Sequence, residues 1–363
     1  MEGGSYWSVD MMKVGVVGLR RGSGLFRVFH NHKQTDVTAL CDLDRDLAQR
    51  IASEHNVPEV YSDFDTFLNS NLDVVVVATP APIHVTQSIG AMEAGCHVLS
   101  EVPAAYSLEE CRALVSSVEK TGQVYMMAEN MNYYHYVMDW RKRIQGGELG
   151  EVFYAEAEYI HDCRGLMQKP DGSPTWRASM PPIYYCTHSL GPLLDILDDR
   201  CVSVVGMATG SHTLSHLGTT DMEVGLFRTE KGRVLKVLCG FTVTREPGMH
   251  WQIFYGTKGT LENGRSPEEQ AKVFKPNGEM TGFMPVLSDP DAPEEARTGG
   301  HGTTEYYMVD EFIKAVREGE SPPIDVYRSL DFSVPGLCAH QSALNGGEPV
   351  SVPDFRPSSP PGE

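Results

Sequence analysis

The most informative stretch of the chain is Lys13-Val-Gly-Val-Val-Gly18-Leu-Arg-Arg-Gly-Ser-Gly24.

 The apolar run that ends at Gly18 predicts a buried parallel strand, and the apolar-periodic stretch from Leu25 to His30 predicts a helix. A strand, a glycine-rich turn and a helix form the context in which the backbone approaches a pyrophosphate and the helix N-terminus supplies positive potential. We therefore predict that Gly18, Arg20 and Gly22 contact a dinucleotide, with Arg20 standing where a second glycine is usual.

The next strand indicates which dinucleotide is bound. The stretch from Asp36 to Leu40 ends in Cys41-Asp42, and Asp42 follows Gly18 by about 24 residues. A carboxylate at that spacing accepts hydrogen bonds from ribose hydroxyls and repels a 2′-phosphate. NAD is therefore favoured over NADP as the cofactor, and Arg45 is the nearby residue that opposes this preference.

Two more strands place polar residues at the same edge of the predicted sheet. Val74 to Ala78 is wholly apolar and His97 to Leu99 forms a further strand. Ligands of doubly wound sheets bind at the carboxyl ends of the strands. The predicted cofactor contacts there are Thr79, Pro80, His84, Glu101 and Val102. Taken singly, Thr79, Pro80 and His84 are better explained by helix capping and turn chemistry.

After about Tyr125 the residue pattern differs from that of the first part of the chain, and this difference predicts a second domain. Alternating runs predict strands at Val202 to Ala208, Met222 to Thr229, Val234 to Thr244 and Met249 to Gly256, with a hairpin-like turn at 256–260. We expect a loop from Ser266 to Gly299, then helices from Glu305 to Glu318 and from Ser329 to Leu344. The expected division is a disordered segment at 1–12, an NAD-binding domain at 13–127, a substrate-binding domain at 128–355 and a flexible tail at 356–363.

Composition limits the possible partners. The formal net charge of −19 over 363 residues opposes binding to nucleic acid and to anionic membranes. No apolar run reaches the roughly 18 residues that span a bilayer, and Met1 to Met11 does not resemble a secretory signal. The eight cysteines are widely scattered, as is typical of reduced thiols, so we expect a cytoplasmic protein.

Two motifs together carry a resemblance to a known family. Ala78-Thr-Pro-Ala-Pro-Ile-His84 and Ala94-Gly-Cys-His-Val-Leu-Ser-Glu-Val-Pro103 resemble the Gfo/Idh/MocA superfamily of NAD(P)-dependent sugar oxidoreductases. The resemblance implies an N-terminal Rossmann domain followed by an α+β domain with an open, mostly antiparallel sheet. It also implies a homo-oligomer, either a dimer or a tetramer. The family usually has Glu-Lys-Pro where this chain has Glu101-Val102-Pro103, so the lysine that assists proton transfer is replaced.

An ordered set of shorter motifs resembles one branch of that superfamily, the NAD-dependent α-N-acetylgalactosaminidases and related redox-neutral glycosidases. The set comprises Glu129-Asn130, Tyr185-x-Thr187-His188-x-Leu-Gly-Pro192, Arg228-Thr-Glu-Lys-Gly232, Gly256-Thr-Lys-Gly259, Gly300-His301-Gly302, Asp325-Val-Tyr327 and Val352-Pro353-Asp354-Phe355. Because this branch tends to lack the lysine, the resemblance makes Val102 an expected feature. The chain departs from the pattern at Arg245-Glu246-Pro247, where relatives usually have Pro-Arg-Pro, and at Tyr184, where the superfamily usually has an aspartate.

Four residues are candidates for proton transfer. His188 carries an imidazole, the side chain most often used for general acid–base catalysis, and Tyr185 lies three residues before it, so the two side chains can share one face of a helical turn. His301 and Glu129 are further candidates, and for each of the four a buried hydrogen-bonding role is the alternative. Asn130, Trp176 and Arg177 are the remaining predicted cofactor contacts.

Two other patterns carry less weight. His212 and His216 have helical metal-ligand spacing, but no third ligand is fixed beside them, so no metal site is predicted. Tyr133, Tyr134 and Tyr136 either stack on a sugar or pack in the core.

These observations favour one function and leave two alternatives. The leading hypothesis is an NAD-dependent, redox-neutral glycoside hydrolase that oxidises a sugar ring carbon, eliminates the C1 substituent, adds water and reduces the carbon again. The first alternative is an NAD-dependent sugar or polyol dehydrogenase with net hydride transfer. The second is a non-catalytic protein that senses a sugar or NAD.

Overall fold

The computed structural model describes residues 11–357. The expected disordered N-terminus and flexible tail lie almost entirely outside the described residues. Met12 already belongs to the first strand, and Arg356 is bonded to Asp331 and Asp354. No helix among residues 11–357 is both long enough and apolar enough to cross a membrane.

The chain forms two compact units, and the first contains a parallel sheet. Its six strands follow the order β3-β2-β1-β4-β5-β6, and every pairing between them is parallel. Val74–Val77 is fully buried, because helices cover both faces of a sheet of this kind. The strands are β1 (Met12–Val17), β2 (Thr35–Cys41), β3 (Glu59–Tyr61), β4 (Val74–Val77), β5 (His97–Ser100) and β6 (Tyr125–Met127). The helices that precede β6 are α1 (Leu19–Asn31), α2 (Arg45–His55), α3 (Phe64–Phe67), α4 (His84–Glu93) and α5 (Leu108–Thr121). The predicted Rossmann domain is confirmed.

The same unit contains a segment from late in the chain. Residues 291–325, including helix α8 (Thr304–Glu318), cluster with the parallel sheet. The Phe29 and Phe312 rings meet edge to face with centroids 6.5 Å apart, so α8 covers an apolar side of α1. Arg27 Nε donates to the Thr298 carbonyl at 3.0 Å. The expected linear division at 127/128 does not assign this returning segment to the first unit.

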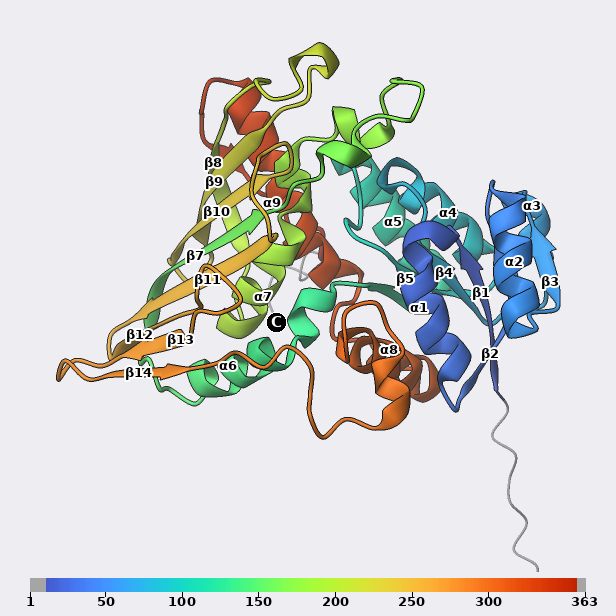
Figure 1. Ribbon diagram of the computed structural model, residues 1–363, viewed down its shortest axis with the longest axis horizontal. Coiled ribbons are helices and arrows are strands. Elements are labelled where there is room, and N and C mark those ends of the chain that lie inside the picture. Colours follow the sequence, from blue (N-terminus) through green and yellow to red (C-terminus); the bar gives the residue numbers. More distant parts are fainter. Residues whose placement is uncertain (1–10, 358–363) are drawn as a thin grey trace, which may run out of the picture. The chain divides into compact units, whose positions relative to one another are not determined.

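The second unit is built on a nine-stranded sheet in the order β14-β13-β12-β11-β7-β10-β9-β8-β15. Only the β7–β10 pair is parallel, so the predicted open and mostly antiparallel sheet is confirmed. Helices α7 and α9 pack against one face of this sheet (Figure 1). The strands are β7 (Val152–Ile160), β8 (Cys201–Ala208), β9 (Met222–Thr229), β10 (Val234–Gly240), β11 (Met249–Gly256), β12 (Gly259–Glu262), β13 (Ala271–Phe274), β14 (Met280–Phe283) and β15 (Val350–Ser351). The helices are α6 (His135–Gln145), α7 (Thr187–Leu197) and α9 (Val326–Leu344).

Three sequence expectations for this sheet need correction. The expected loop from Ser266 to Gly299 contains β13 and β14, whose four-residue strands are hidden among proline and acidic residues. The run predicted to end at Thr244 ends at Gly240, because the pairing with β7 and β9 stops there. Strand β7, which lies between β10 and β11, was not predicted, since its exposed Phe153 and buried Glu158 break the apolar alternation.

Candidate functional site

The turn after β1 forms a cradle that side chains would fill. Gly18 has a φ of 87°, in the region that favours glycine, and a Cβ there would lie 2.5 Å from the Ala78 carbonyl oxygen. A Cβ at Gly22 would lie 2.9 Å from the Ala78 Cβ. Helix α1 begins at Leu19, earlier than predicted, so Arg20, Gly22 and Gly24 are helical and its N-terminus opens directly at Gly18. This geometry suits the close approach of a pyrophosphate and fits the predicted NAD.

Asp42 follows β2 and is hydrogen-bonded to the first residue of α1, next to the Gly18 turn. Its carboxylate accepts hydrogen bonds from the Leu19 amide at 2.7 Å and from the Asp44 amide at 2.8 Å. Arg20 pairs with Asp44 at 3.0 Å and points its largely exposed side chain away from the sheet core. Arg45 is exposed at the first turn of α2. Asp42 therefore fixes the turn, and its half-exposed carboxylate has remaining lone pairs for ribose hydroxyls.

The residues that follow β4 are linked to one another by hydrogen bonds. His84 Nε2 lies 2.7 Å from the Thr79 carbonyl oxygen, and the Thr79 hydroxyl donates to Gln87 Oε1 at 2.5 Å. Pro80 precedes the short helical turn that leads into α4. His84 is buried, so it acts by shaping the loop rather than by presenting its ring to solvent.

Glu101 and Val102 follow β5, and the boundary between the two units falls between them. Glu101 is buried and pairs with Arg21 Nη2 at 2.9 Å. Val102 is also buried and carries no group that moves a proton.

His301 lies in the first unit, in the segment that packs against α1. Its Nδ1 lies 2.5 Å from Glu305 Oε1, and its amide donates to Glu305 Oε2 at 2.9 Å. A Cβ at Gly24 would lie 3.4 Å from the Gly300 amide nitrogen, so the two backbones are in close approach. Burial raises the pKa of Glu305, but the hydrogen bonds and charge of His301 outweigh it and hold that pKa below its ordinary value.

The other three predicted catalytic residues come together in the second unit. Glu129 follows β6, and His188 lies in the first turn of α7. His188 Nδ1 lies 2.6 Å from Glu129 Oε1, where the two side chains are 12% and 0% exposed. Because Nδ1 faces the carboxylate, the imidazole is oriented and Nε2 remains for proton transfer. The Tyr185 ring lies 5.8 Å from the His188 ring, as the predicted spacing requires.

Three aromatic side chains that the sequence reasoning missed contact His188 or Tyr185. The rings of Tyr159 and His250 lie 5.2 and 6.0 Å from the His188 ring, and Phe241 meets Tyr185 at 5.6 Å. Tyr159 and His250 are directly opposite on β7 and β11, and their rings stack 4.3 Å apart. Burial raises the pKa of Tyr159, so its phenol stays neutral. The register between β7 and β11 would have revealed this pair, but β7 itself was not predicted.

Arg177 joins this cluster from a short helical turn at Trp176–Ser179. Its Nη1 donates to the Tyr185 hydroxyl at 3.4 Å, and its guanidinium lies 4.5 Å from the Trp176 ring centre. Asn130 is buried in the turn that follows Glu129. Within the second unit, Arg177 and Trp176 therefore accompany Tyr185.

Tyr184, which stands where an aspartate is usual, belongs to a different environment. Its ring meets those of Tyr106 and His340 edge to face at 5.0 and 5.5 Å. Burial raises the pKa of Tyr184 to about 12. His340 pairs in turn with Glu223 at 2.7 Å, so this is a second histidine–glutamate pair with a buried carboxylate in the same unit.

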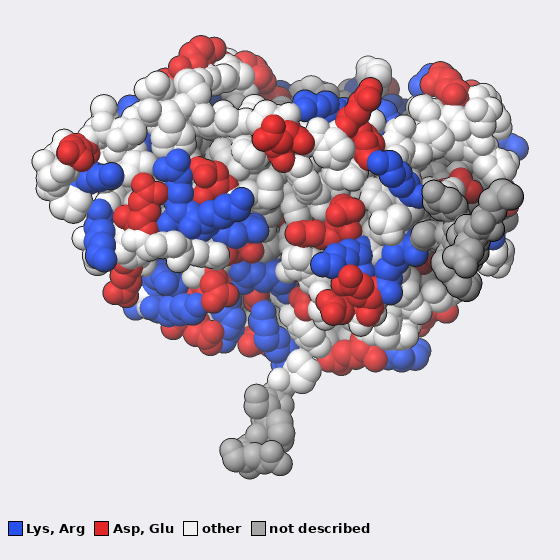
Figure 2. Space-filling model, turned by 90° about the horizontal axis from the view of Figure 1, so that it is seen from below, with Lys and Arg blue, Asp and Glu red and all other residues white. Residues whose placement is uncertain are grey.

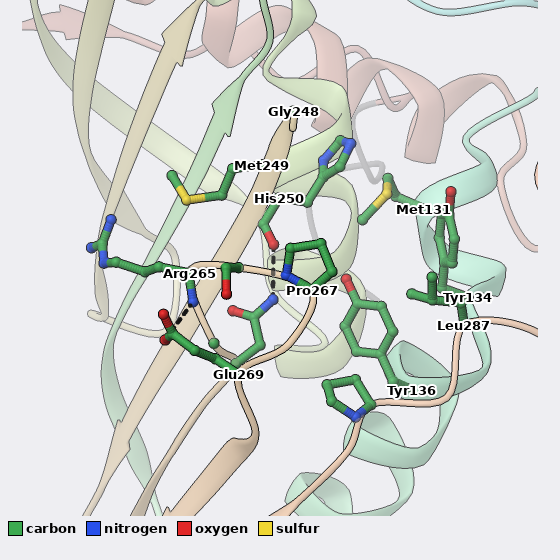
Figure 3. Close-up of a pocket in the computed structure, with 14 residues that line it drawn as sticks. Met131, Tyr134, Tyr136, Gly248, Met249, His250, Arg265, Pro267, Glu269 and Leu287 are labelled. Atoms are coloured by element: carbon green, nitrogen blue, oxygen red, sulfur yellow. Dashed lines mark hydrogen bonds between the residues drawn. The ribbon is translucent and has the colours of Figure 1, made fainter. Parts of the chain in front are cut away.

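Tyr159, Tyr185 and His250 form a cluster around His188. A pocket of about 260 Å³ adjoins this His188 cluster, because His250 also lines the pocket (Figure 3). Tyr134 and Tyr136 line it, and Tyr133 does not. No group of three or more potential metal ligands occurs within residues 11–357, and His212 Nε2 lies 2.8 Å from the Thr209 carbonyl oxygen.

Two parts of the chain match known protein families. Residues 12–129 match the Gfo/Idh/MocA oxidoreductase family, NAD-binding Rossmann fold, and residues 291–359 match the C-terminal domain of glycosyl hydrolase 109. A glycosyl hydrolase family 109 protein of Solibacter usitatus is 29% identical, covering 98% of this chain and 90% of the relative. One from Shewanella putrefaciens is 28% identical, with coverages of 96% and 85%.

A solved structure is similar over nearly the whole fold. Levoglucosan dehydrogenase in complex with NADH and levoglucosan aligns with a TM-score of 0.81 at 20% identity, covering 95% of this chain and 100% of that one. At this identity the likeness supports the two-domain fold alone.

Proposed function

We propose that this chain, which combines a Gfo/Idh/MocA NAD-binding domain with a glycosyl hydrolase 109 C-terminal domain, is an NAD-dependent glycosidase without net redox change. The scheme is transient oxidation of a sugar ring carbon, elimination of the C1 substituent, addition of water and reduction. The observation that carries the proposal is the His188–Glu129 pair, because it supplies a proton-transfer group. The Val102 side chain has no such group.

The turn after β1 fits NAD, because α1 begins directly after Gly18, which has no side chain, and the Asp42 carboxylate lies beside that helix N-terminus. NAD supplies the hydride acceptor for the sugar carbon and returns the hydride at the end. We assign cofactor binding to 13–127 and substrate binding to 128–355. The cofactor contacts proposed from the sequence are Gly18, Arg20, Gly22, Asp42, Arg45, Thr79, Pro80, His84, Glu101, Val102, Asn130, Trp176 and Arg177.

His188 and Tyr185 are the proposed acid–base groups. His188 takes the hydroxyl proton during oxidation and returns it during reduction, and buried Glu129 stabilises the imidazolium between those steps. Tyr185, held by Arg177 and acting as the phenolate, takes the C2 proton during elimination. The C1 substituent leaves with its bonding electrons and receives that proton from Tyr185, so it departs as an alcohol and the phenolate is regenerated. Water then supplies a hydroxyl to C1 and a proton to C2, so the net reaction is hydrolysis. We retain His301 as a further proton-transfer candidate held by Glu305.

Turnover of nitrophenyl glycosides in D₂O tests this scheme. Purified protein with NAD⁺ should release nitrophenol from at least one glycoside in a panel of sugars and anomers, without accumulating NADH, and the product should carry deuterium at C2. His188→Ala should abolish release, whereas His340→Ala, which disrupts the other histidine–glutamate pair, should retain it. NADH formed in proportion to substrate would instead establish a net dehydrogenase, and no cleavage of any glycoside would refute the proposal.

We propose a small-molecule carbohydrate as the partner, and no nucleic acid or membrane. The net charge of −19 supports this, and Figure 2 shows acidic side chains interspersed with basic ones on the face drawn. A cytoplasmic location is supported by the eight cysteines, all of which are free thiols.

We also propose a homo-oligomer, dimer or tetramer, formed through the outer face of the nine-stranded sheet. Strand register places five exposed apolar side chains on this one face: Met207, Leu226, Tyr255, Phe274 and Met280. The Lys236–Glu156 pair lies on the same face between these strands, so the proposed interface combines apolar and charged side chains. Sedimentation analysis of wild type and Leu226→Glu tests it, since the charge should yield monomers.

A further inference from the structure

The pocket of about 260 Å³ in the second unit has two walls (Figure 3). One wall is formed by Met131, Tyr134 and Tyr136, from the turn before α6 and its start, together with Pro285 and Leu287. The segment containing Leu287 is fixed to α6, because the His135 and Tyr136 amides donate to the Leu287 and Val286 carbonyls. The opposite wall comprises the start of β11, residues 263–267 and Glu269.

The polar side chains of the pocket are largely engaged with other protein groups. Asn263 accepts from the Gln252 amide at 2.7 Å and donates to the His250 carbonyl at 2.8 Å. Arg265 pairs with both oxygens of Glu158, and Glu269 accepts from the Arg265 amide. The remaining lining is mostly aromatic, thioether and aliphatic. A second sugar would require several convergent donors and acceptors, so this pocket favours an apolar group.

His250 connects the pocket to the reactive cluster. Its ring stacks on Tyr159 and lies 6.0 Å from the His188 ring, and it also lines the pocket. A substrate whose sugar is bound beside His188 therefore has this pocket as a neighbouring place for its other half.

We propose that the pocket binds the leaving group of the glycoside and selects a compact aromatic or bulky aliphatic aglycone. This inference rests on the proposed glycosidase function and names the substrate class of that site. The rings of Tyr134 and Tyr136 offer aromatic contacts, and Met131 and Met249 adapt to the shape of an apolar group.

Benzyl and methyl glycosides of one accepted sugar and anomer provide the test. The two leaving alcohols have similar acidity, so the chemical step is matched and the comparison isolates aglycone binding. Wild type should show kcat/KM about tenfold or more higher for the benzyl glycoside, as burial of one aromatic ring predicts. Binding of 2-naphthol, followed by fluorescence, gives a readout that does not depend on cleavage.

Two substitutions alter the pocket in different ways. Ser266→Trp fills it and should reduce kcat/KM for the benzyl glycoside about tenfold towards that of the methyl glycoside, with loss of naphthol binding. Leu287→Ser removes part of one pocket wall, at a side chain that is 58% exposed. This change should reduce kcat/KM for the benzyl glycoside about threefold. Glu268→Trp and Val286→Ser are matched controls, because these neighbours do not line the pocket and should leave the preference unchanged.

The outcomes separate this inference from the function on which it rests. Equal kcat/KM for the two glycosides in wild type, or equal losses for both in Ser266→Trp, would overturn the aglycone assignment while cleavage stands. If neither glycoside nor any other is cleaved, the glycosidase proposal itself fails, and naphthol binding that survives Ser266→Trp would show that the pocket takes no such group.

Discussion

Glu129→Gln should impair proton transfer while preserving the shape of the site. The carboxylate is fully buried, and its Oε1 lies 2.6 Å from His188 Nδ1. Glutamine keeps an oxygen acceptor for the imidazole but removes the negative charge that stabilises its protonated form. Two opposite unit charges about 4 Å apart contribute about 4 kcal/mol at an effective dielectric constant of about 20.

This interaction energy sets the expected size of the effect. Since part of the hydrogen bond survives, we expect kcat to fall about 10²- to 10³-fold, which corresponds to about 3 to 4 kcal/mol. Binding of NAD and sugar should change by less than about threefold, because the charge matters most when His188 is protonated.

Steady-state glycosidase kinetics with saturating NAD⁺, alongside urea unfolding, measure the effect. Glu223→Gln is the matched control, since Glu223 is likewise buried and pairs with His340 at 2.7 Å outside the aromatic cluster. That control should lose stability but keep kcat within about threefold. A folded Glu129→Gln enzyme with nearly unchanged kcat would refute the role given to the pair.

Three further predictions concern cofactor binding and stability. Gly18→Ala should weaken NAD binding at least about tenfold in a fluorescence titration, because its Cβ meets the Ala78 carbonyl oxygen; Gly95→Ala, with a φ of 92° and open space, is the control that isolates backbone strain. Arg233→Met should cost about 3 to 5 kcal/mol in urea unfolding, because it leaves the buried Asp199 carboxylate without its 2.6 Å partner, whereas Lys231→Met at an exposed pair should cost less than about 1 kcal/mol. Glu305→Gln should lower stability at neutral pH: the folded pKa of Glu305 lies below its ordinary value, so its contribution is present above that value and is lost on acidification. The stability gap between wild type and Glu305→Gln should therefore narrow between about pH 5 and pH 3, and a gap independent of pH would contradict this.

The first unit was predictable because its signals are local. A buried apolar run, a glycine turn and an acidic residue after the next strand identify β1, α1 and β2 without any knowledge of distant contacts. The spacing of Tyr185 and His188 likewise predicts their proximity, which the structure gives as 5.8 Å between ring centres.

The rest of the site depends on strand register, which the sequence leaves open. Tyr159 and His250 stack only because β7 and β11 pair with these residues opposite one another, over about 90 intervening residues. The short strands β13 and β14 carry too few residues to show a period of two. The pairing of Glu129 with His188 similarly requires the path of the chain between them, which no local pattern specifies.

The return of residues 291–325 to the first unit has a consequence for how the protein is made. In that unit His32 Nε2 lies 3.2 Å from the carboxylate of Asp310, which is 278 residues away in the chain, and Arg27 bonds to Thr298 across 271 residues. When only the first six strands have emerged from the ribosome, helix α8, which covers Phe29, has not yet been synthesised. The apolar side of α1 therefore stays uncovered until most of the chain has been synthesised, and a fragment ending near residue 129 should be prone to aggregation.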